Sequence, residues 1–178
     1  MLDCLLKKEY TEITAQEIYT GANISKRTFY NYFRDKYDLL PWFWRFRLNK
    51  YFYRTLPEYY LQQLYIIKQY PTQFQRAFDY HGQNNFVDYA VVNTIEKYRL
   101  HVSKTIYEKY PEHIVESALL YSARASVGGT VVFSRTKEDL DALISNAEQN
   151  PDVPLRLYAI SIFSDYLSFE PYPSGMHL

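Results

Sequence analysis

Hydrogen-bonding side chains crowd one short stretch of the chain, NISKRTFYNYF, which runs over residues 23–33. Two phenylalanines stand among serine, lysine, arginine, threonine, tyrosine and asparagine, which offer donors and acceptors of different lengths. If the stretch is helical and Lys26 is placed at 0°, Phe29 and Phe33 lie at roughly 300° and 340°. The residues that fall on the opposite side, between roughly 100° and 200°, are Arg27, Thr28 and Asn31. The spacing therefore predicts a helix over residues 26–33 with an aromatic inner face and a hydrogen-bonding outer face.

An outer face of this kind has the chemistry needed to read base pairs in a DNA major groove. The guanidinium of Arg27 can donate two hydrogen bonds to one guanine, which makes it the expected base reader ahead of Thr28 and Asn31. Longer donors on the flanks of the helix, and the starts of neighbouring helices, can meet the phosphates on either side. The candidate DNA-contacting residues are Thr14, Ser25, Lys26, Arg27, Thr28, Tyr30, Asn31, Tyr32 and Lys36.

Two short helices and a tight turn must hold these side chains in place. Thr14 and Glu17 have the spacing of a capping box, which predicts a helix of about two turns that ends near Gly21. Asn23 lies in the connection, where a positive φ is easiest for glycine and next easiest for asparagine. Ser25 then caps the helix over residues 26–33. Two short helices joined by such a turn form a helix-turn-helix motif.

Further helices are expected along the rest of the chain, and no stretch shows convincing strand alternation. Asp35 caps a third helix from Lys36, and Pro41 predicts a kink or an early break in it. The clearest helical pattern lies in residues 85–110, where apolar residues recur at steps of three or four. The other expected segments are residues 2–8, 42–53, 58–69, 73–80, 112–133, 137–148 and 154–168.

The segment EITAQEIYTGANISKRTFYNYFRDKYDLL, residues 12–40, resembles the DNA-binding domain of the TetR family of bacterial transcription regulators. In that family Ile-Thr opens the first motif helix, Ser-x-x-Thr-Phe-Tyr-x-Tyr-Phe forms the recognition helix, and Asp-Lys-x-x-Leu starts the connecting helix. The resemblance covers about residues 1–50. Two features depart from the family pattern: the first helix is shorter than usual, and Asn23 replaces the commoner turn glycine.

The resemblance implies an all-α fold with two domains: a three-helix DNA-binding domain over residues 1–50, and a helical effector-binding and dimerisation domain over residues 51–178. It implies a transcriptional regulator, usually a repressor, that binds a near-palindromic operator as a homodimer and responds to a small-molecule effector. Residues 112–133 and the segments between 137 and 168 would pair with a second subunit. Gly128 and Gly129 fit either close helix approach there or a kink. No motif identifies the effector or its contact residues.

The charge distribution agrees with a contact module joined to a larger body. The chain is neutral overall, but residues 1–55 hold 10 basic and 6 acidic residues, a net charge of +4, and the remainder carries −4. Cys4 is the only cysteine, so no intramolecular disulfide can form and a reducing compartment is expected. We find no apolar run that could span a membrane and no signal-peptide pattern, and we expect a cytoplasmic protein.

Catalytic and metal-binding alternatives find little support. The four histidines, His81, His101, His113 and His177, lack metal-ligand spacing, and no glycine-rich phosphate loop or nucleophile elbow occurs. We therefore expect no metal, no cofactor and no enzymatic activity. A protein-interaction co-regulator whose helix-turn-helix no longer reads DNA remains the alternative function, motivated by the short first helix and the neutral total charge.

Overall fold

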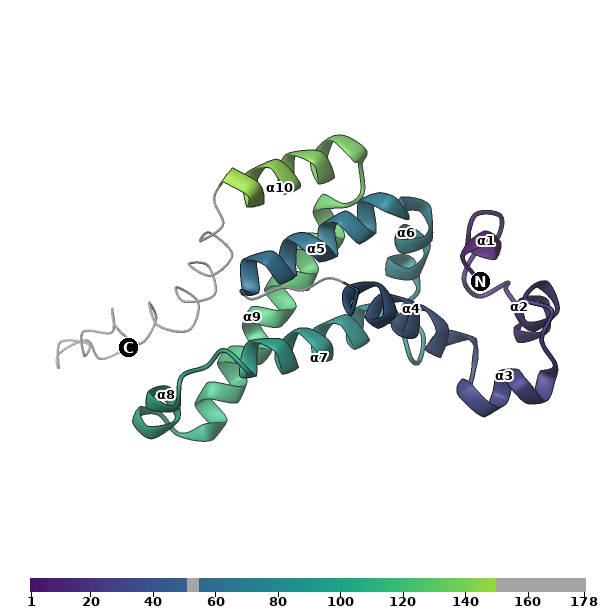
Figure 1. The fold of residues 1–178 in the computed structure, drawn as a ribbon. Helices are drawn as coiled ribbons and strands as arrows, with labels where there is room; N and C mark the ends of the chain where they lie inside the picture. The colour runs from purple at the N-terminus through teal and green to yellow at the C-terminus, as the bar shows by residue number, and fades with distance from the viewer. Residues whose placement is uncertain (51–54, 150–178) are drawn as a thin grey trace, which may run out of the picture.

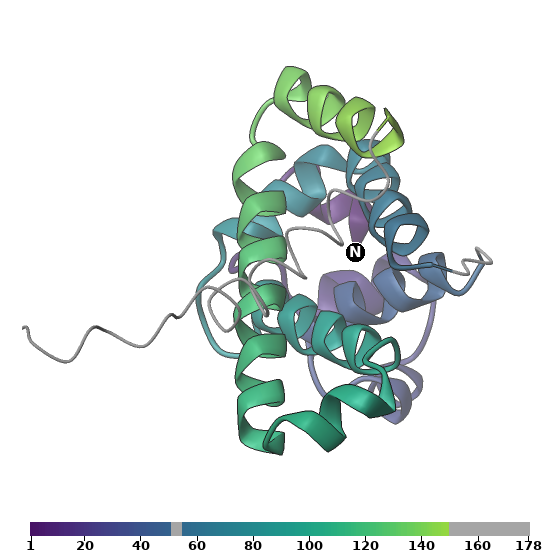
Figure 2. The ribbon, with the colours of Figure 1, turned by 90° about the vertical axis from the view of Figure 1, so that its left-hand side faces the viewer.

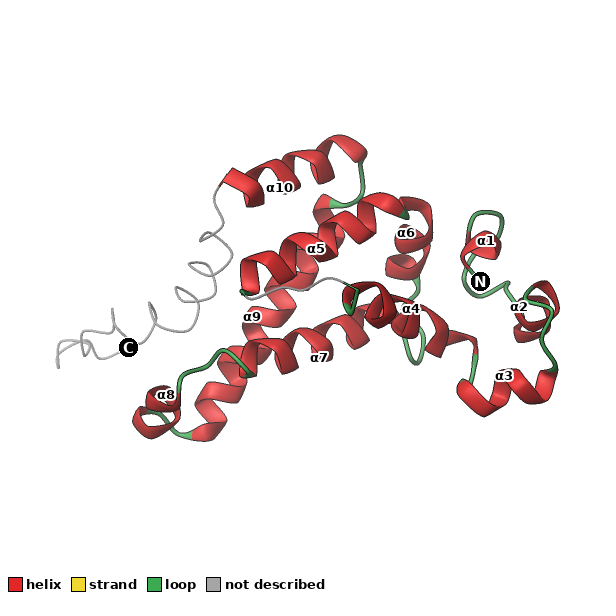
Figure 3. Ribbon diagram, in the orientation of Figure 1, coloured by secondary structure: helices red, strands yellow, loops and turns green. Residues whose placement is uncertain are grey.

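The computed structural model describes residues 1–50 and 55–149 of the 178-residue chain, and the secondary structure of these residues is helical (Figure 3). The elements, in chain order, are α1 (Leu2–Leu5), α2 (Ala15–Gly21), α3 (Lys26–Tyr32), the 3-10 turn η1 (Lys36–Asp38), α4 (Leu39–Leu48), α5 (Leu56–Gln69), α6 (Pro71–Asp79), α7 (Phe86–Arg99), α8 (Lys104–Lys109), α9 (Glu112–Phe133) and α10 (Lys137–Gln149). The expectation of an all-α fold is confirmed for this part of the chain.

The small helices α1, α2 and α3 gather at one end of the molecule, and α4 leads from them into the helices that follow (Figure 1). In that body α9 is the longest helix and packs against α7, while α10 packs against α5. Figure 2 shows α9 running along one side of the body with α10 across its end. The helix α1 contacts α6 as well, so the N-terminal end touches the body at more than its connecting helix.

One hydrophobic cluster extends from the N-terminal helices through α4 into the body. Phe29 and Leu40 are completely buried on the N-terminal side, and Trp44 is 2% exposed on α4. The Trp44 ring meets Phe74 and Phe86 edge-on, with centroids 5.3 and 5.4 Å apart. Because Trp44 belongs to both the connecting helix and the aromatic core of the body, a movement of α4 would disturb that core.

Most expected helix positions are confirmed because their end signals are local. The helix expected over residues 58–69 is α5, which begins at Leu56 because Thr55 and Glu58 form a second capping box. The segment expected over residues 73–80 is α6, which begins at Pro71, a residue favoured in the first turn of a helix. The segments 112–133 and 137–148 correspond to α9 and α10, and 154–168 lies outside the described residues.

The single helix expected over residues 85–110 is wrong, because the chain forms α7 and α8 with a break between them. The amides of His101 and Val102 bond to carbonyls only three residues back, and Ser103 takes the extended conformation of an N-cap. The Ser103 side chain makes no cap hydrogen bond to α8, so the break rests on the backbone of residues 101–103. Both α7 and α8 pack against α9. The spacing of apolar residues therefore continues across the break, although the two helices have different directions (Figure 1).

Two further expectations need correction near the N-terminus. The first helix covers only Leu2–Leu5 instead of residues 2–8. The helix expected from Lys36 begins with the 3-10 turn η1, and the α-helix starts at Leu39, which places Pro41 in its first turn. Proline is tolerated there because the first-turn amides have no helical acceptor, so the change of helix type precedes Pro41. The segment expected over residues 42–53 is described as helix as far as Leu48.

Candidate nucleic-acid interface

The helix α3 is fixed to the protein by one aromatic side chain. Phe29 is completely buried, and its ring centroid lies 6.1 Å from that of Tyr19 on α2. Within its own segment the Phe29 ring meets Tyr30 at 5.1 Å and Phe33 at 5.5 Å. Phe33 is the C-cap, with extended backbone, so the helix ends one residue earlier than expected. The expected inner face of the helix is confirmed, with Phe29 as its centre.

The polar residues of α3 lie on the outside, as the helical spacing predicts. Lys26, Arg27 and Asn31 are exposed, and the aromatic side chains of Tyr30 and Tyr32 are 47% and 79% exposed. An exposed tyrosine can pack its ring against a partner while its hydroxyl makes a hydrogen bond. The outer face of α3 therefore presents aromatic, basic and amide groups to whatever lies against it.

The start of α3 is held by local hydrogen bonds. The Ser25 hydroxyl accepts from the Thr28 amide at 3.0 Å and lies 2.8 Å from the Thr28 hydroxyl. Asn23 has the expected positive φ, 53°, and its amide donates to the Thr20 carbonyl. Asparagine tolerates this conformation better than most residues, so it can serve in place of glycine in the turn. The expected turn and N-cap are confirmed.

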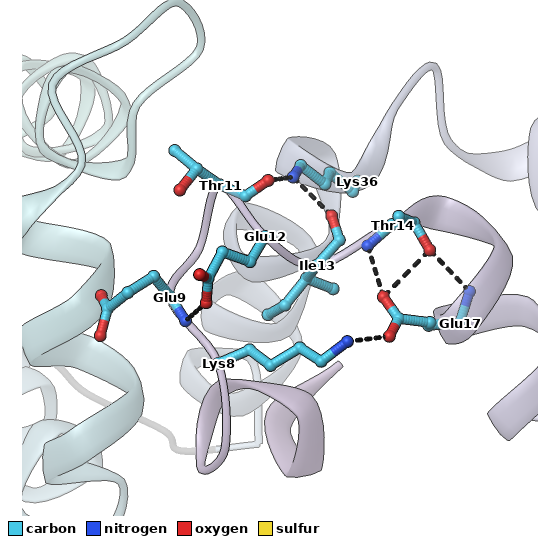
Figure 4. A network of polar contacts seen from close by, with 8 residues as sticks. All are labelled: Lys8, Glu9, Thr11, Glu12, Ile13, Thr14, Glu17 and Lys36. Carbon is cyan, nitrogen blue, oxygen red and sulfur yellow. Dashed lines mark hydrogen bonds and ion pairs between the residues drawn. The ribbon is translucent and has the colours of Figure 1, made fainter.

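A polar network fixes the start of α2 (Figure 4). The Thr14 hydroxyl accepts from the Glu17 amide at 3.1 Å, and the Glu17 carboxylate accepts from the Thr14 amide at 2.8 Å. Lys8, which follows α1, forms an ion pair with the same carboxylate. These contacts, led by the hydrogen bond from Lys8, lower the pKa of Glu17 from its usual value near 4.5 to about 2. Glu17 thus ties the segment after α1 to the first helix of the motif.

Acid should weaken this part of the protein through Glu17. Because the pKa is lower in the folded state, the stabilisation is complete above pH 4.5 and is lost as the pH falls toward about 2. We expect Glu17→Gln to reduce the dependence of the unfolding free energy on pH across this window, measured by urea denaturation at pH 5 and pH 3. Glutamine keeps the capping-box hydrogen bond, so the charge alone is removed.

Lys8→Met should also reduce the pH dependence of the unfolding free energy, and the effects of Lys8→Met and Glu17→Gln should not add. An unchanged pH dependence in Glu17→Gln would contradict the assignment.

Lys36 faces inward instead of standing free on the surface. Its ammonium donates to the carbonyl oxygens of Tyr10 at 2.9 Å, Thr11 at 2.8 Å and Ile13 at 2.5 Å. Partial burial lowers the pKa of Lys36. Since an ammonium has three N–H donors, these bonds occupy its full capacity. Lys36 thereby ties the connection between α1 and α2 to η1, and a phosphate contact stays a prediction that would require one of these bonds to open.

Two cations of α3 differ from Lys8 and Arg34, which form ion pairs. Lys8 pairs with Glu17, and Arg34 pairs with Asp38 at 3.2 Å. Lys26 and Arg27 are exposed and form no ion pair within the described part of the chain. Unpaired, exposed cations attract an anionic partner without first giving up a protein contact. The first turn of α3 thus carries positive charge that no ion pair in the described part of the chain compensates.

Comparison with protein families identifies this end of the chain. Residues 2–41 match the model described as bacterial regulatory proteins, tetR family. Residues 2–41 therefore form a TetR-family domain. A search of curated proteins finds no match to the chain. In this TetR-family domain α2 and α3 are the helix-turn-helix, and α3 is in the position of the recognition helix.

Sequence reasoning missed the side chains of the body that hold the TetR-family domain. Arg76 and Tyr80 contact the N-terminal segment across 71 and 43 residues of sequence, respectively. Neither belongs to a motif, so no local signal would have found them. In residues 1–50 and 55–149 no cluster of three metal-ligating side chains occurs. Nor is any helix of that part long and apolar enough to cross a membrane.

Proposed function

We propose that this protein is a TetR-family transcriptional regulator, a repressor, that binds a near-palindromic operator in the cytoplasm as a homodimer. The observation that carries the proposal is the outer face of α3, where exposed donors stand opposite the buried Phe29 in a domain matched to the TetR family. A helix anchored on one side and polar on the other can lie in a major groove. The division into residues 1–50 for DNA and 51–178 for effector and dimer contacts is part of the same proposal.

Each polar residue of α3 has a proposed part in DNA binding. Arg27 reads guanine, with Thr28 and Asn31 as further base contacts. The side chains of Lys26, Tyr30 and Tyr32 contact phosphates or sugars, which position the helix without reading sequence. The short hydroxyl residues Thr14 and Ser25 already cap α2 and α3, so their contribution would come through ordering the helix starts. For Lys36 the same indirect contribution is proposed, through its carbonyl contacts.

Arg27→Ala should relax base discrimination. We expect a loss of about 1–3 kcal/mol, or roughly 5- to 150-fold, between the preferred fragment and a copy changed at the contacted guanine. The measurement is fluorescence anisotropy with DNA from upstream of the protein's own coding region, against a scrambled competitor, at two salt concentrations. Selective binding that weakens with salt in the unaltered protein would support the proposed function.

Lys26→Ala serves as the matched control, because it removes a neighbouring exposed cation. It should weaken binding to all sequences about equally and reduce the slope of log affinity against log salt by about one per half-site. If Arg27→Ala weakens all sequences equally as well, Arg27 is a phosphate contact. If the unaltered protein binds no fragment selectively, the protein-interaction alternative gains support.

The outer face of α9 is the proposed dimer contact. Tyr121, Ala125, Gly128 and Val132 form one stripe along the helix, since they are spaced by four, three and four residues. Tyr121 and Val132 are 64% and 63% exposed, and a Cβ added at Gly128 would meet nothing within 4 Å. An apolar stripe with a glycine at its centre allows two helices to approach closely. An isologous dimer places the same stripe on both partners.

We place the effector between α4 and α7. The indole Nε1 of Trp44 and the hydroxyl of Tyr89 are buried, and neither has a hydrogen-bond partner among the described residues. Both rings contact Phe86, at 5.4 and 6.0 Å. A buried donor without a partner costs about 1–3 kcal/mol, which an acceptor on a neutral ligand would recover. Since Trp42→Phe leaves Trp44 as the only indole, an effector that releases DNA should change its fluorescence in that variant.

A further inference from the structure

A short segment of the body, residues 76–84, holds the TetR-family domain from both sides of its helix-turn-helix. We call it the docking segment; it comprises the end of α6 and the connection to α7. Its contacts reach α1 and the chain after it, which precede the motif, and η1, which follows α3. These contacts bear on the orientation that α3 takes relative to the body of the protein.

Arg76 makes the first of these contacts. Its Nη1 donates to the carbonyl oxygens of Leu5 at 2.9 Å and Lys8 at 2.5 Å, and its Nε lies 3.4 Å from a carboxylate oxygen of Glu9. The last carbonyls of a helix have no partner within the helix, and Arg76 supplies one to α1. A helix of four residues is too short to be stable alone, so this contact fixes where α1 lies.

Tyr80 makes the second contact, through its ring. It stacks on Tyr37 with centroids 4.7 Å apart and planes 5° apart, and both rings meet Tyr10 edge-on at 5.4 and 5.2 Å. Burial, together with a hydrogen bond to Tyr80, raises the pKa of Tyr37 to about 12. Aromatic pairs in these geometries contribute beyond their buried area. Tyr37 belongs to η1, so Tyr80 supports the connection between α3 and α4.

The backbone of the docking segment is shaped to deliver Tyr80. The Tyr80 hydroxyl donates to the Gln83 carbonyl at 3.1 Å, and a Cβ on Gly82 would lie only 2.3 Å from that hydroxyl. Asn84 has φ 57°, and its side-chain amide donates to Asp35 at 3.2 Å. Asp35 in turn accepts from the Tyr37 amide at 2.7 Å. A Cβ at position 82 would therefore push the Tyr80 ring from its present place.

We propose that Tyr80 and Arg76 are positioning residues for the recognition helix. They touch no proposed DNA-contacting residue, but they fix the chain just before α2 and just after α3, so the two helices between these points take one orientation on the body. A dimer must present two recognition helices at one spacing to reach both half-sites, which makes this orientation decisive for affinity. The proposal rests on the proposed DNA-binding function and assigns it a determinant outside the DNA-binding domain.

Tyr80→Ala tests the proposal, with Tyr80→Phe as the matched control. We expect Tyr80→Ala to weaken operator binding roughly tenfold, which corresponds to about 1.4 kcal/mol and to the loss of two aromatic contacts. The salt dependence should be unchanged, because no phosphate contact is removed. Phenylalanine keeps the stacking and should restore binding to within about threefold. Equal loss in both variants would overturn the role of the ring.

A second readout separates this inference from the proposed function, because it needs no DNA. Amide hydrogen exchange should become faster in α1, α2 and α3 of Tyr80→Ala and stay unchanged in α9. Unchanged exchange in the three N-terminal helices, or faster exchange throughout the chain, would overturn the positioning role. If the unaltered protein binds no DNA, the proposed function fails, while the exchange experiment still decides whether Tyr80 holds the domain.

Gly82→Ala provides a variant that replaces none of the residues whose side chains make the contacts. The added methyl group would displace the Tyr80 ring, so the variant should reproduce the faster exchange and the weaker binding of Tyr80→Ala. In a protein that carries both Tyr80→Ala and Gly82→Ala, the methyl group has no ring to displace. The effects of the two substitutions on exchange and on binding should therefore not add. Additive effects would show that Gly82 acts by another route and would overturn the proposed link to Tyr80.

Discussion

Gly128→Leu is expected to convert the proposed dimer into monomers without unfolding the subunit. Within one subunit a Cβ at this position meets nothing within 4 Å, and leucine is a better helix former than glycine. In an α9 pair the added side chains would meet across the two-fold axis. Overpacking costs about 1–3 kcal/mol per site and occurs twice, so dimerisation should weaken by about 2–6 kcal/mol, which is at least roughly thirtyfold.

The measurement is sedimentation or light scattering over a range of protein concentrations, together with thermal unfolding. Thr105→Leu is the matched control, because it adds an exposed leucine to α8, outside the segments expected at the dimer contact. The control should keep the oligomeric state of the unaltered protein. A Gly128→Leu protein that dimerises as well as the control would remove α9 from the interface. Loss of the dimer should also weaken operator binding, since one subunit reaches one half-site.

Phe29→Ala is expected to cost about 3–5 kcal/mol of unfolding free energy, the second large effect. The ring is completely buried and joins α3 to α2 through Tyr19, so its removal leaves a cavity where the recognition helix is anchored. Total stabilities of small proteins are about 5–15 kcal/mol, so a loss of this size should disorder the N-terminal domain. Urea denaturation, followed by circular dichroism, measures the change.

Tyr32→Ala is the matched control, because it removes an aromatic ring from the same helix at a position that is 79% exposed. It should change the unfolding free energy by no more than about 0.5 kcal/mol while weakening DNA binding. The two variants thus separate the inner face of α3 from the outer one. A large loss of stability in Tyr32→Ala, or a loss below about 1 kcal/mol in Phe29→Ala, would contradict this division.

Lys36 illustrates how one residue type fits two different interpretations. In the sequence it follows Asp35 at the start of a helix, where a lysine beside a DNA-reading motif predicts a phosphate contact. In the structure its ammonium reaches back 23 to 26 residues to three carbonyls. The acceptors belong to a connection between helices, and no pattern of apolar residues reveals where such a connection passes. The burial of an apolar side chain can often be predicted from its residue type. The partner of a charged side chain cannot be predicted in this way.

The sequence by itself determined the elements whose signals lie within about four residues. These include the capping box of α2, the Ser25 cap, the positive φ of Asn23 and the inward position of Phe29. Caps and turns form from neighbouring groups, and helical spacing alone decides which side chains share a face. The same local pattern indicated the resemblance to the TetR DNA-binding domain, and the family match over residues 2–41 confirms that resemblance.

Only the tertiary structure decided how these elements are held together. Both α7 and α8 pack against α9 on either side of their break, and the contacts of Arg76 and Tyr80 join residues that lie 71 and 43 positions apart. Partners so far apart meet only after the intervening helices have packed, and arginine and tyrosine are common enough that their types do not reveal the pairing. Local chemistry thus determined the recognition helix, whereas long-range packing determined the direction in which it points.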